Sequence, residues 1–196
     1  MSKYYLMKLS LVPAKMGAAK LESFIQSHLG IAYTDLSSHF GTDDLVTSKM
    51  VSDLNQDGLK TVDVIMNPFN RVFVEYLTNV FMSAPTVGEI NECVSPPAFQ
   101  DYVKALYGDD SSTRKKMNHC EVRPAVDYLI RVENYEQDLK KIPELATANT
   151  KGILSDMEFL YNNMYRAYYD DESKALITSV FNADFTKYGY TFWLLI

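Results

Sequence analysis

The chain has 196 residues, of which 47% are hydrophobic and 22% are charged. This composition is typical of a globular domain long enough to bury a core, and it excludes an intrinsically disordered chain. With 25 acidic and 19 basic residues, and a net charge of -6 at pH 7, the chain is not expected to bind nucleic acid over a broad basic face. Any anion-binding site must therefore be a local pocket.

The cysteines and the hydropathy of the chain indicate the compartment. Cys93 and Cys120 stand far apart and form no C-x-x-C pair, so neither a metal knuckle nor a disulfide framework is expected. No run of about 18 or more apolar residues is present, and the first residues lack the apolar segment and cleavage site of a signal peptide. We therefore expect a cytoplasmic protein with reduced thiols and no membrane partner. The sequence does not indicate the oligomeric state.

The first predicted elements are a strand over Tyr4–Val12 and a helix over Ala18–Leu29. The strand is rich in β-forming residues and a proline ends it, whereas the helix carries apolar residues at helical spacing. The loop between them contains Lys15 and Gly17, and Lys20 follows in the first helical turn. Because a helix N-terminus presents unpaired N–H groups and the positive end of the dipole, a phosphate or sulfate site is expected here. An ordinary strand-to-helix turn that carries lysines is the alternative.

The rest of the chain alternates strands with helices. A buried strand over Lys60–Met66 precedes a helix over Arg71–Phe81. A third strand and a short helix follow further along, and the short helix is expected to direct Asp138 and Lys140 outward. The other predicted elements are the strand Ala125–Val132, the helices Phe99–Tyr107 and Tyr135–Ile142, and a helical region over Ser155–Phe185. Strands that alternate with helices predict a parallel sheet, so the fold class is α/β, and we expect one domain over residues 1–196 with a helix-rich C-terminal half.

Four segments, in order along the chain, carry a family resemblance. They are PAKMGAAKL at 13–21, MNPFNRVFVEY at 66–76, IRVENYEQDL at 130–139 and DFTKYGY at 184–190. Each is similar to a signature of the sulfotransferases that use 3′-phosphoadenosine 5′-phosphosulfate (PAPS). The chain resembles the carbohydrate-type branch of this family in particular, and the order and spacing of the segments extend the resemblance over nearly the whole chain.

The resemblance implies a P-loop-like parallel sheet flanked by helices, PAPS as co-substrate and no metal. The implied reaction moves a sulfuryl group from PAPS to a hydroxyl or amine of a carbohydrate or another small acceptor. Such a transfer needs stabilisation of charge on the bridging oxygen, and by its position Lys15 supplies this charge. Arg71 matches the second arginine of the second signature and would make a forked contact to a phosphate. The implied nucleotide-binding residues are Gly17, Ala18, Ala19, Lys20 and Arg71.

Two positions of the second signature depart from the family pattern. Its first arginine is replaced by Met66 and its serine by Val74, and the first loop lacks the usual serine or threonine. A charge-assisted contact contributes about 1.5 to 3 kcal/mol, so losing two such contacts weakens binding by on the order of a hundredfold or more. Restoring arginine by Met66→Arg is expected to tighten nucleotide binding. The alternative is a sulfotransferase-like protein that binds a nucleotide or anion, or acts as a structural interaction protein, without catalysis.

A general base is sought among three histidines. His39 lies in a loop after the first strand and helix, where the family often supplies an acceptor-side histidine, and its ordinary pKa suits proton abstraction. A solvent-exposed loop histidine is the alternative. His28 falls late in the first helix and is expected at the surface, whereas His119 beside Cys120 is not expected to form a catalytic pair. Glu133 resembles the strand-end glutamate of the family, with a structural role.

Two further patterns have simpler interpretations. The segment DLNQDG at 53–58 resembles the opening of a calcium-binding loop, but Val64 occupies the place of the closing glutamate and a strand follows. A turn is therefore expected, and no metal site. The aromatic residues Phe159, Tyr161, Tyr165, Tyr168 and Tyr169 are expected to form a packed helix face, with a ligand cage as the alternative, and the 14 tyrosines of the chain leave room for one to stack on an adenine or a sugar ring.

Overall fold

The structure is a computed structural model and falls into two compact units. The described residues are 3–7, 18–29, 58–83, 94–108, 126–154 and 164–192. Unit 1 comprises Met1–Met66 and His119–Asp156, and unit 2 comprises Asn67–Asn118 and Met157–Ile196. Unit 1 contains the strands of the described residues, whereas unit 2 is helical. The chain is therefore of mixed α/β class, as predicted.

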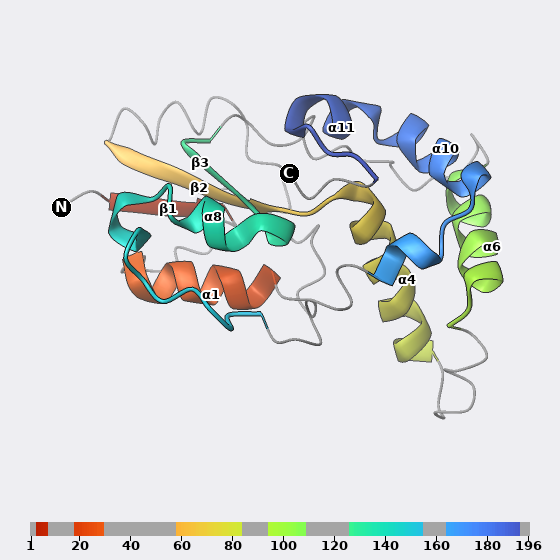
Figure 1. The fold of residues 1–196 in the computed structure, drawn as a ribbon, viewed down its shortest axis with the longest axis horizontal. Coiled ribbons are helices and arrows are strands. Elements are labelled where there is room, and N and C mark those ends of the chain that lie inside the picture. Colours follow the sequence, from red (N-terminus) through yellow and green to blue (C-terminus); the bar gives the residue numbers. More distant parts are fainter. Residues whose placement is uncertain are drawn as a thin grey trace, which may run out of the picture. The chain divides into compact units, whose positions relative to one another are not determined.

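Unit 1 is built on a small parallel sheet (Figure 1). The described strands are β1 (Lys3–Met7), β2 (Leu59–Ile65) and β3 (Tyr128–Arg131), in the order β1-β2-β3. Both neighbouring pairs are parallel, and the register places Met7 beside Asp63 and Ile65 beside Arg131. The predicted parallel sheet is confirmed. Because the strands run the same way, their carboxyl ends lie along one edge of the sheet.

The central strand and the first helix form the core of unit 1. In β2, every residue from Thr61 to Ile65 is buried, as expected for a strand with neighbours on both sides. Helix α1 (Ala18–Leu29) has the predicted bounds and packs against β1 and β2, where Leu21 and Ile25 are fully buried. Four residues separate these two side chains, which places them on the same face of the helix.

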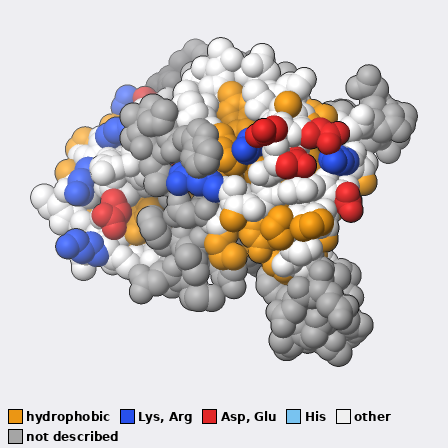
Figure 2. Space-filling model, turned by 45° about the vertical axis from the view of Figure 1, so that its right-hand side comes forward, with side chains coloured by type: hydrophobic (Ala, Val, Ile, Leu, Met, Phe, Trp, Pro, Cys, Tyr) orange, Lys and Arg blue, Asp and Glu red, His pale blue; other side chains and the backbone are white. Residues whose placement is uncertain are grey.

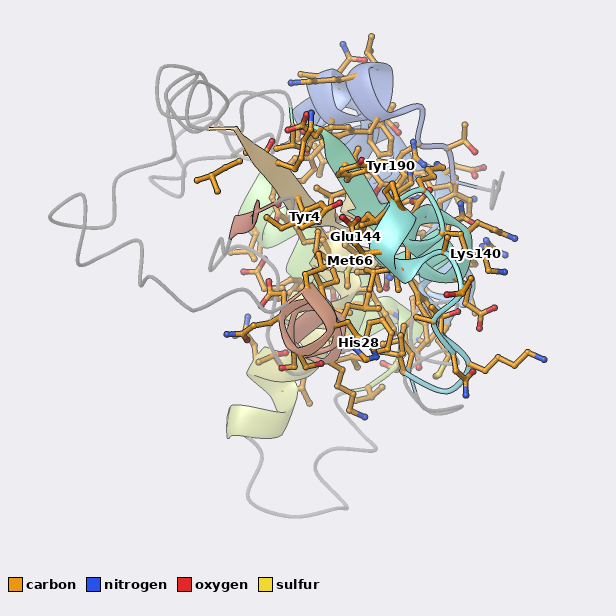
Figure 3. The ribbon with its side chains drawn as sticks, turned by 90° about the vertical axis from the view of Figure 1, so that its left-hand side faces the viewer. Tyr4, His28, Met66, Lys140, Glu144 and Tyr190 are labelled. Carbon is orange, nitrogen blue, oxygen red and sulfur yellow. The ribbon has the colours of Figure 1, made fainter. Side chains whose placement is uncertain are left out.

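The segment after β3 returns to the edge strand β1. It forms the 3-10 helix η1 (Val132–Asn134), the short helix α8 (Tyr135–Leu139) and the 3-10 helix η2 (Pro143–Leu145). The hydroxyl of Tyr4 in β1 donates a hydrogen bond to the carboxylate of Glu144 in η2, and Figure 3 shows the two side chains close together. Burial and the neighbouring carboxylate raise the pKa of Tyr4. The pair thus ties η2 to β1.

Unit 2 is a cluster of helices around aromatic side chains. Its described elements are α4 (Pro68–Ser83), α6 (Pro96–Tyr107), η3 (Tyr165–Ala167), α10 (Asp171–Val180) and α11 (Asn182–Tyr188). Phe73 of α4 and Phe99 of α6 are fully buried, and their ring centroids lie 5.5 Å apart in a T-shaped arrangement. Tyr168 and Tyr169 pack on the same rings. Tyr165 and Tyr169 are buried and Tyr168 is half-buried, so these tyrosines pack as expected, although they lie in and directly after the 3-10 helix η3 and not on the face of an α-helix.

Two helices of unit 2 begin three residues earlier than the sequence predicted. In each case a proline occupies the first helical position. A backbone N–H at that position would have no acceptor within the helix, so the lack of an N–H in proline costs no hydrogen bond. Before α4, the side chain of Asn67 accepts a hydrogen bond from the Phe69 amide (3.0 Å), and before α6 the Ser95 hydroxyl accepts one from the Ala98 amide (3.4 Å). These side chains cap the helices, so the prolines start them rather than interrupt them.

The surface of unit 2 carries interspersed charges of both signs. Figure 2 shows acidic and basic side chains next to one another on the face turned towards the viewer. Lys104 of α6 and Glu172 of α10 form an ion pair, with 2.7 Å between nitrogen and oxygen. No helix in the described ranges combines the length and the apolar character that crossing a membrane requires.

Candidate functional site

The candidate site is the carboxyl edge of the parallel sheet in unit 1. Strand β1 ends at Met7 and helix α1 begins at Ala18, so a strand precedes the lysine-bearing segment and a helix follows it, as predicted. In open parallel sheets, ligands bind outside the carboxyl ends of the strands. The amides of Ala18 and Ala19 are among the first four of α1, which have no acceptor within the helix, and Lys20 is exposed in the first turn.

Several predicted residues lie outside the described residues. They are Lys15, Gly17 and His39, together with His119, the two cysteines and most of the calcium-loop-like segment at 53–58. Their predicted roles therefore stay predictions. Within the described ranges, no group of three or more His, Cys, Asp or Glu side chains lies close enough together to hold a metal ion.

His28 lies at the opposite end of α1 from the candidate site. Its imidazole is exposed, stacks on the Phe24 ring with 4.0 Å between the ring centroids, and has Nδ1 at 2.9 Å from the carbonyl oxygen of Phe24. The Ser27 hydroxyl lies 3.2 Å from the same nitrogen, and the contact with the Phe24 carbonyl is a hydrogen bond in the tautomer that has its proton on Nδ1. His28 is thus the surface residue of the last helical turn that the sequence predicted.

Arg71, the predicted phosphate ligand of the second signature, lies in the core of unit 2. The residue is 7% exposed, and its Nη2 lies 3.5 Å from Oδ2 of Asp184, which is 1% exposed. The guanidinium also lies over the ring of Phe181, 4.5 Å from its centroid. The second and the last of the four family-like segments are therefore joined by a buried ion pair, although 113 positions separate the two residues.

Two hydrogen bonds join the segment at 66–76 to other residues of the C-terminal part of unit 2. The side-chain amide of Asn67 donates to the carbonyl of Thr191 (3.1 Å), and the hydroxyl of Tyr169 donates to the carbonyl of Phe69 (3.0 Å). Burial raises the pKa of Tyr169 well above its ordinary value. The family-like segments at 66–76 and 184–190 thus contribute to one packed structure.

The two departures from the second signature are core residues. Met66 is 1% exposed and Val74 is fully buried. Apolar side chains need no hydrogen-bond partner, so methionine and valine can occupy these two buried positions at no cost in lost hydrogen bonds. An arginine at position 66 would place a charge in a buried position, which opposes the sequence-based expectation that Met66→Arg simply adds a phosphate contact.

Asp138 is a buried carboxylate that sequence reasoning placed incorrectly. It was predicted to point outward with Lys140, yet Asp138 is fully buried. Lys140 is exposed, as predicted. Its carboxylate accepts the backbone N–H of Arg131 at 3.0 Å and lies 2.6 Å from Nζ of Lys141. The Asn134 amide donates to it at 3.4 Å, and Nη1 of Arg131 lies at 3.4 and 3.5 Å from its two oxygens. Burial removes the water that would solvate the carboxylate, and these donors compensate for that loss.

The position of Asp138 in the short helix was a usable sign of this burial. Tyr135 and Leu139 lie four residues apart and are both buried, and Asp138, three residues after Tyr135, falls on the same helix face. A second sign was the presence of one cation on each side of the acid along the chain, Arg131 before it and Lys141 after it. Glu133, by comparison, lies half-buried in η1 immediately after β3.

A second carboxylate connects β2 to the start of β3 at the amino ends of these strands. Asp127, just before β3, accepts hydrogen bonds from the Thr61 amide and hydroxyl, both at 2.9 Å, and pairs with Lys60 at 3.0 Å. Partial burial opposes ionisation, but the Thr61 amide and Lys60 together lower the pKa of Asp127 below its ordinary value. This group lies at the amino end of β2, so we assign it to the fold rather than to a ligand site.

Comparison of the chain with family models, with curated proteins and with solved structures gives no significant match. The sulfotransferase resemblance therefore rests on the four sequence segments alone. What the structure adds is the parallel sheet, the strand and helix on either side of the lysine-bearing segment, and the contacts of Arg71 and Asp138.

Proposed function

We propose that the chain binds PAPS at the carboxyl edge of the unit 1 sheet and transfers its sulfuryl group to a hydroxyl or amine of a carbohydrate or another small acceptor. The observation that supports this proposal is the order strand, lysine-bearing segment, helix at that edge, with β1 and β2 parallel. This is the edge at which parallel α/β sheets bind ligands, and a helix N-terminus there favours an anion.

The proposed reaction is an in-line displacement at sulfur. The acceptor oxygen or nitrogen attacks the sulfur atom, the bond between sulfur and the bridging phosphate oxygen breaks, and 3′-phosphoadenosine 5′-phosphate (PAP) leaves with that electron pair. In this scheme Lys15 stabilises the charge that grows on the bridging oxygen, together with the loop amides. The acceptor loses its proton to a base, for which His39 is the candidate.

A second candidate function is binding of a nucleotide or another anion without catalysis. The burial of Met66 and Val74 favours it, because two polar contacts of the second signature are missing. The pairing of Arg71 with Asp184 favours it as well, since this arginine is engaged within unit 2. A nucleotide that uses Arg71 as a phosphate ligand would have to separate it from a buried carboxylate, which is costly.

The test combines calorimetric titration with PAP and a transfer assay with PAPS and a panel of carbohydrate acceptors. We expect micromolar binding of PAP by the wild type. Lys15→Ala should lower transfer by about 100-fold to 1000-fold, the usual cost of losing one contact to developing charge, at an unchanged melting temperature. Lys151→Ala removes an exposed lysine of unit 1 and is the matched control with normal transfer. Binding of PAP without transfer to any acceptor would favour the second candidate. No binding at millimolar PAP would reject the PAPS proposal, and the second candidate as well if inorganic phosphate and sulfate also do not bind.

A further inference from the structure

Arg131 ends β3 at the carboxyl edge of the sheet. The register places it beside Ile65, the last residue of the central strand, so its backbone lies at the edge where the ligand of unit 1 is proposed to bind. Its side chain is 33% exposed, in contrast to the almost completely buried side chain of Arg71 in unit 2. Arg131 is therefore a cation that can be reached from solution.

The contact with Asp138 uses only part of the capacity of the Arg131 guanidinium to donate hydrogen bonds. The carboxylate contacts Lys141 at 2.6 Å, whereas the guanidinium contacts are longer, at 3.4 and 3.5 Å, and involve Nη1 alone. Among the described residues, no ion pair links this guanidinium to any other acid. A guanidinium has five N–H donors in a planar fork, so most of them stay available to a ligand.

The three side chains that meet at Asp138 carry a net positive charge, whereas the stretch 131–141 as a whole has three basic and three acidic residues. Arg131 and Lys141 face one carboxylate, so the three side chains together carry one net positive charge. Two further acids, Glu133 and Glu136, lie in the same stretch, and Glu136 accepts a hydrogen bond from the Tyr135 hydroxyl. The backbone N–H of Arg131 bonds to Asp138 and fixes the main chain there, and the contact of Nη1 with the same carboxylate restrains the side chain, which leaves fewer torsions to be ordered on binding.

We propose that Arg131 is an anion-binding residue, positioned by Asp138, that recognises a phosphate or sulfate group at the carboxyl edge of the sheet. The inference rests on the proposed function only for the identity of the ligand as PAPS. A tetrahedral oxyanion can accept two parallel N–H bonds from a guanidinium, which an ammonium group does not offer in that geometry. In a purely structural role, Arg131 would affect the stability of the turn after β3 and leave anion affinity unchanged.

The experiment is calorimetric titration of the full chain with PAP, inorganic phosphate and inorganic sulfate. Arg131→Met should weaken PAP binding about 10-fold to 100-fold, the cost of one charge-assisted contact. Arg131→Lys keeps the charge but not the fork, so it should recover part of the loss. Lys140→Met is the matched control, because Lys140 is exposed in the same stretch, and its affinity should stay within about twofold of the wild type. Thermal melts of every variant exclude unfolding as the cause.

The outcomes separate this inference from the proposed function. If the wild type binds inorganic phosphate or sulfate but not PAP, and Arg131→Met loses that binding, the anion site stands and the PAPS proposal fails. If Arg131→Met binds PAP as tightly as the wild type, the inference is overturned while the PAPS proposal stands. Should Arg131→Met not fold, equal affinity of Arg131→Lys and the wild type overturns the inference, and a reduced affinity supports it. A wild type that binds none of the three anions overturns both.

Discussion

Each unit contains a buried aspartate that is paired with an arginine, but the two arrangements differ. In unit 1, Asp138 has no exposed surface, while its partners Arg131 and Lys141 have side chains that are 33% and 60% exposed. In unit 2, Asp184 and Arg71 are both buried, with side chains that are 2% and 9% exposed. The first arrangement anchors cations that reach solution, whereas the second encloses its cation together with the acid.

This difference separates a cation that can meet a ligand from one that stabilises a fold. The four family-like segments drew attention to Arg71, because it matches an arginine of the second signature. The structure instead gives Arg71 an internal partner from α11 and an aromatic ring beneath its guanidinium. A sequence match specifies the type of residue at a position, but burial and pairing decide whether its charge is available.

Replacing each arginine in turn tests most directly whether the two ion pairs differ in their contribution to stability. Arg71→Met leaves Asp184 buried without its cation, so we expect a loss of about 3 to 5 kcal/mol in the free energy of unfolding. Arg131→Met leaves Asp138 with Lys141 at 2.6 Å and with its backbone and amide donors, so we expect a loss of at most about 1 kcal/mol. Urea denaturation of both variants at pH 7 measures the two values.

A double substitution provides the control for this pair. Arg71→Met combined with Asp184→Leu removes both charges and leaves apolar groups in the core, so it should recover a large part of the stability that Arg71→Met loses. Equal losses for Arg71→Met and Arg131→Met would show that the two pairs are equivalent in solution. The distinction drawn from their exposure would then be wrong.

The next largest effect is expected at Met66. Met66→Arg places an arginine where the side chain is 1% exposed, so we expect the free energy of unfolding to fall by about 3 kcal/mol. Met66→Leu is the matched control and should lose less than about 1.5 kcal/mol, since it conserves the volume. A stable Met66→Arg protein with tighter binding of PAP would instead support the arginine position that the family resemblance implies.

The sequence predicted which helices and strands are present better than it predicted the residues at which they begin. Helix α1 was predicted with its observed bounds because Leu21 and Ile25 belong to a clear apolar stripe, and the observed β2 is shifted by only one residue. Helices α4 and α6 were predicted too short at their starts, because Pro68 and Pro96 were interpreted as breaks. A proline ends a strand and also begins a helix, and local sequence alone does not separate the two cases.

The candidate site was less predictable than the fold. The burial of Asp138 depends on Arg131 and Lys141, which the turn after β3 brings to one carboxylate. The pairing of Arg71 depends on Asp184, which lies far along the chain. Periodicity describes the chemistry of one element at a time, whereas both of these contacts arise from the way in which separate segments pack.

A smaller effect is expected from the cap of α10 in unit 2. The Asp170 side chain accepts the Ser173 amide at 2.8 Å, and the Ser173 hydroxyl lies 3.0 Å from the Asp170 amide, which completes a capping box. Asp170→Ala should therefore lower the free energy of unfolding by about 1 kcal/mol, and Asp171→Ala, which removes the exposed neighbouring acid, by clearly less. Urea denaturation distinguishes these values, and equal effects would show that the cap contributes nothing specific.

The smallest effect is expected at Asp127, and it should depend on pH. Partial burial opposes ionisation of Asp127, but the Thr61 amide and Lys60 lower its pKa below the ordinary value near 4. A carboxyl whose folded pKa is lowered stabilises the fold above the unfolded pKa, and this contribution is lost as pH falls through the folded pKa. Asp127→Asn should therefore be less stable than the wild type at pH 7, by under about 1 kcal/mol because the pair is partly exposed. The difference should shrink as pH falls below about 4, which urea denaturation at pH 7, 5 and 3 measures. A difference that grows towards low pH would contradict the direction of the pKa shift and, with it, the role of Asp127 as a charged link between β2 and β3.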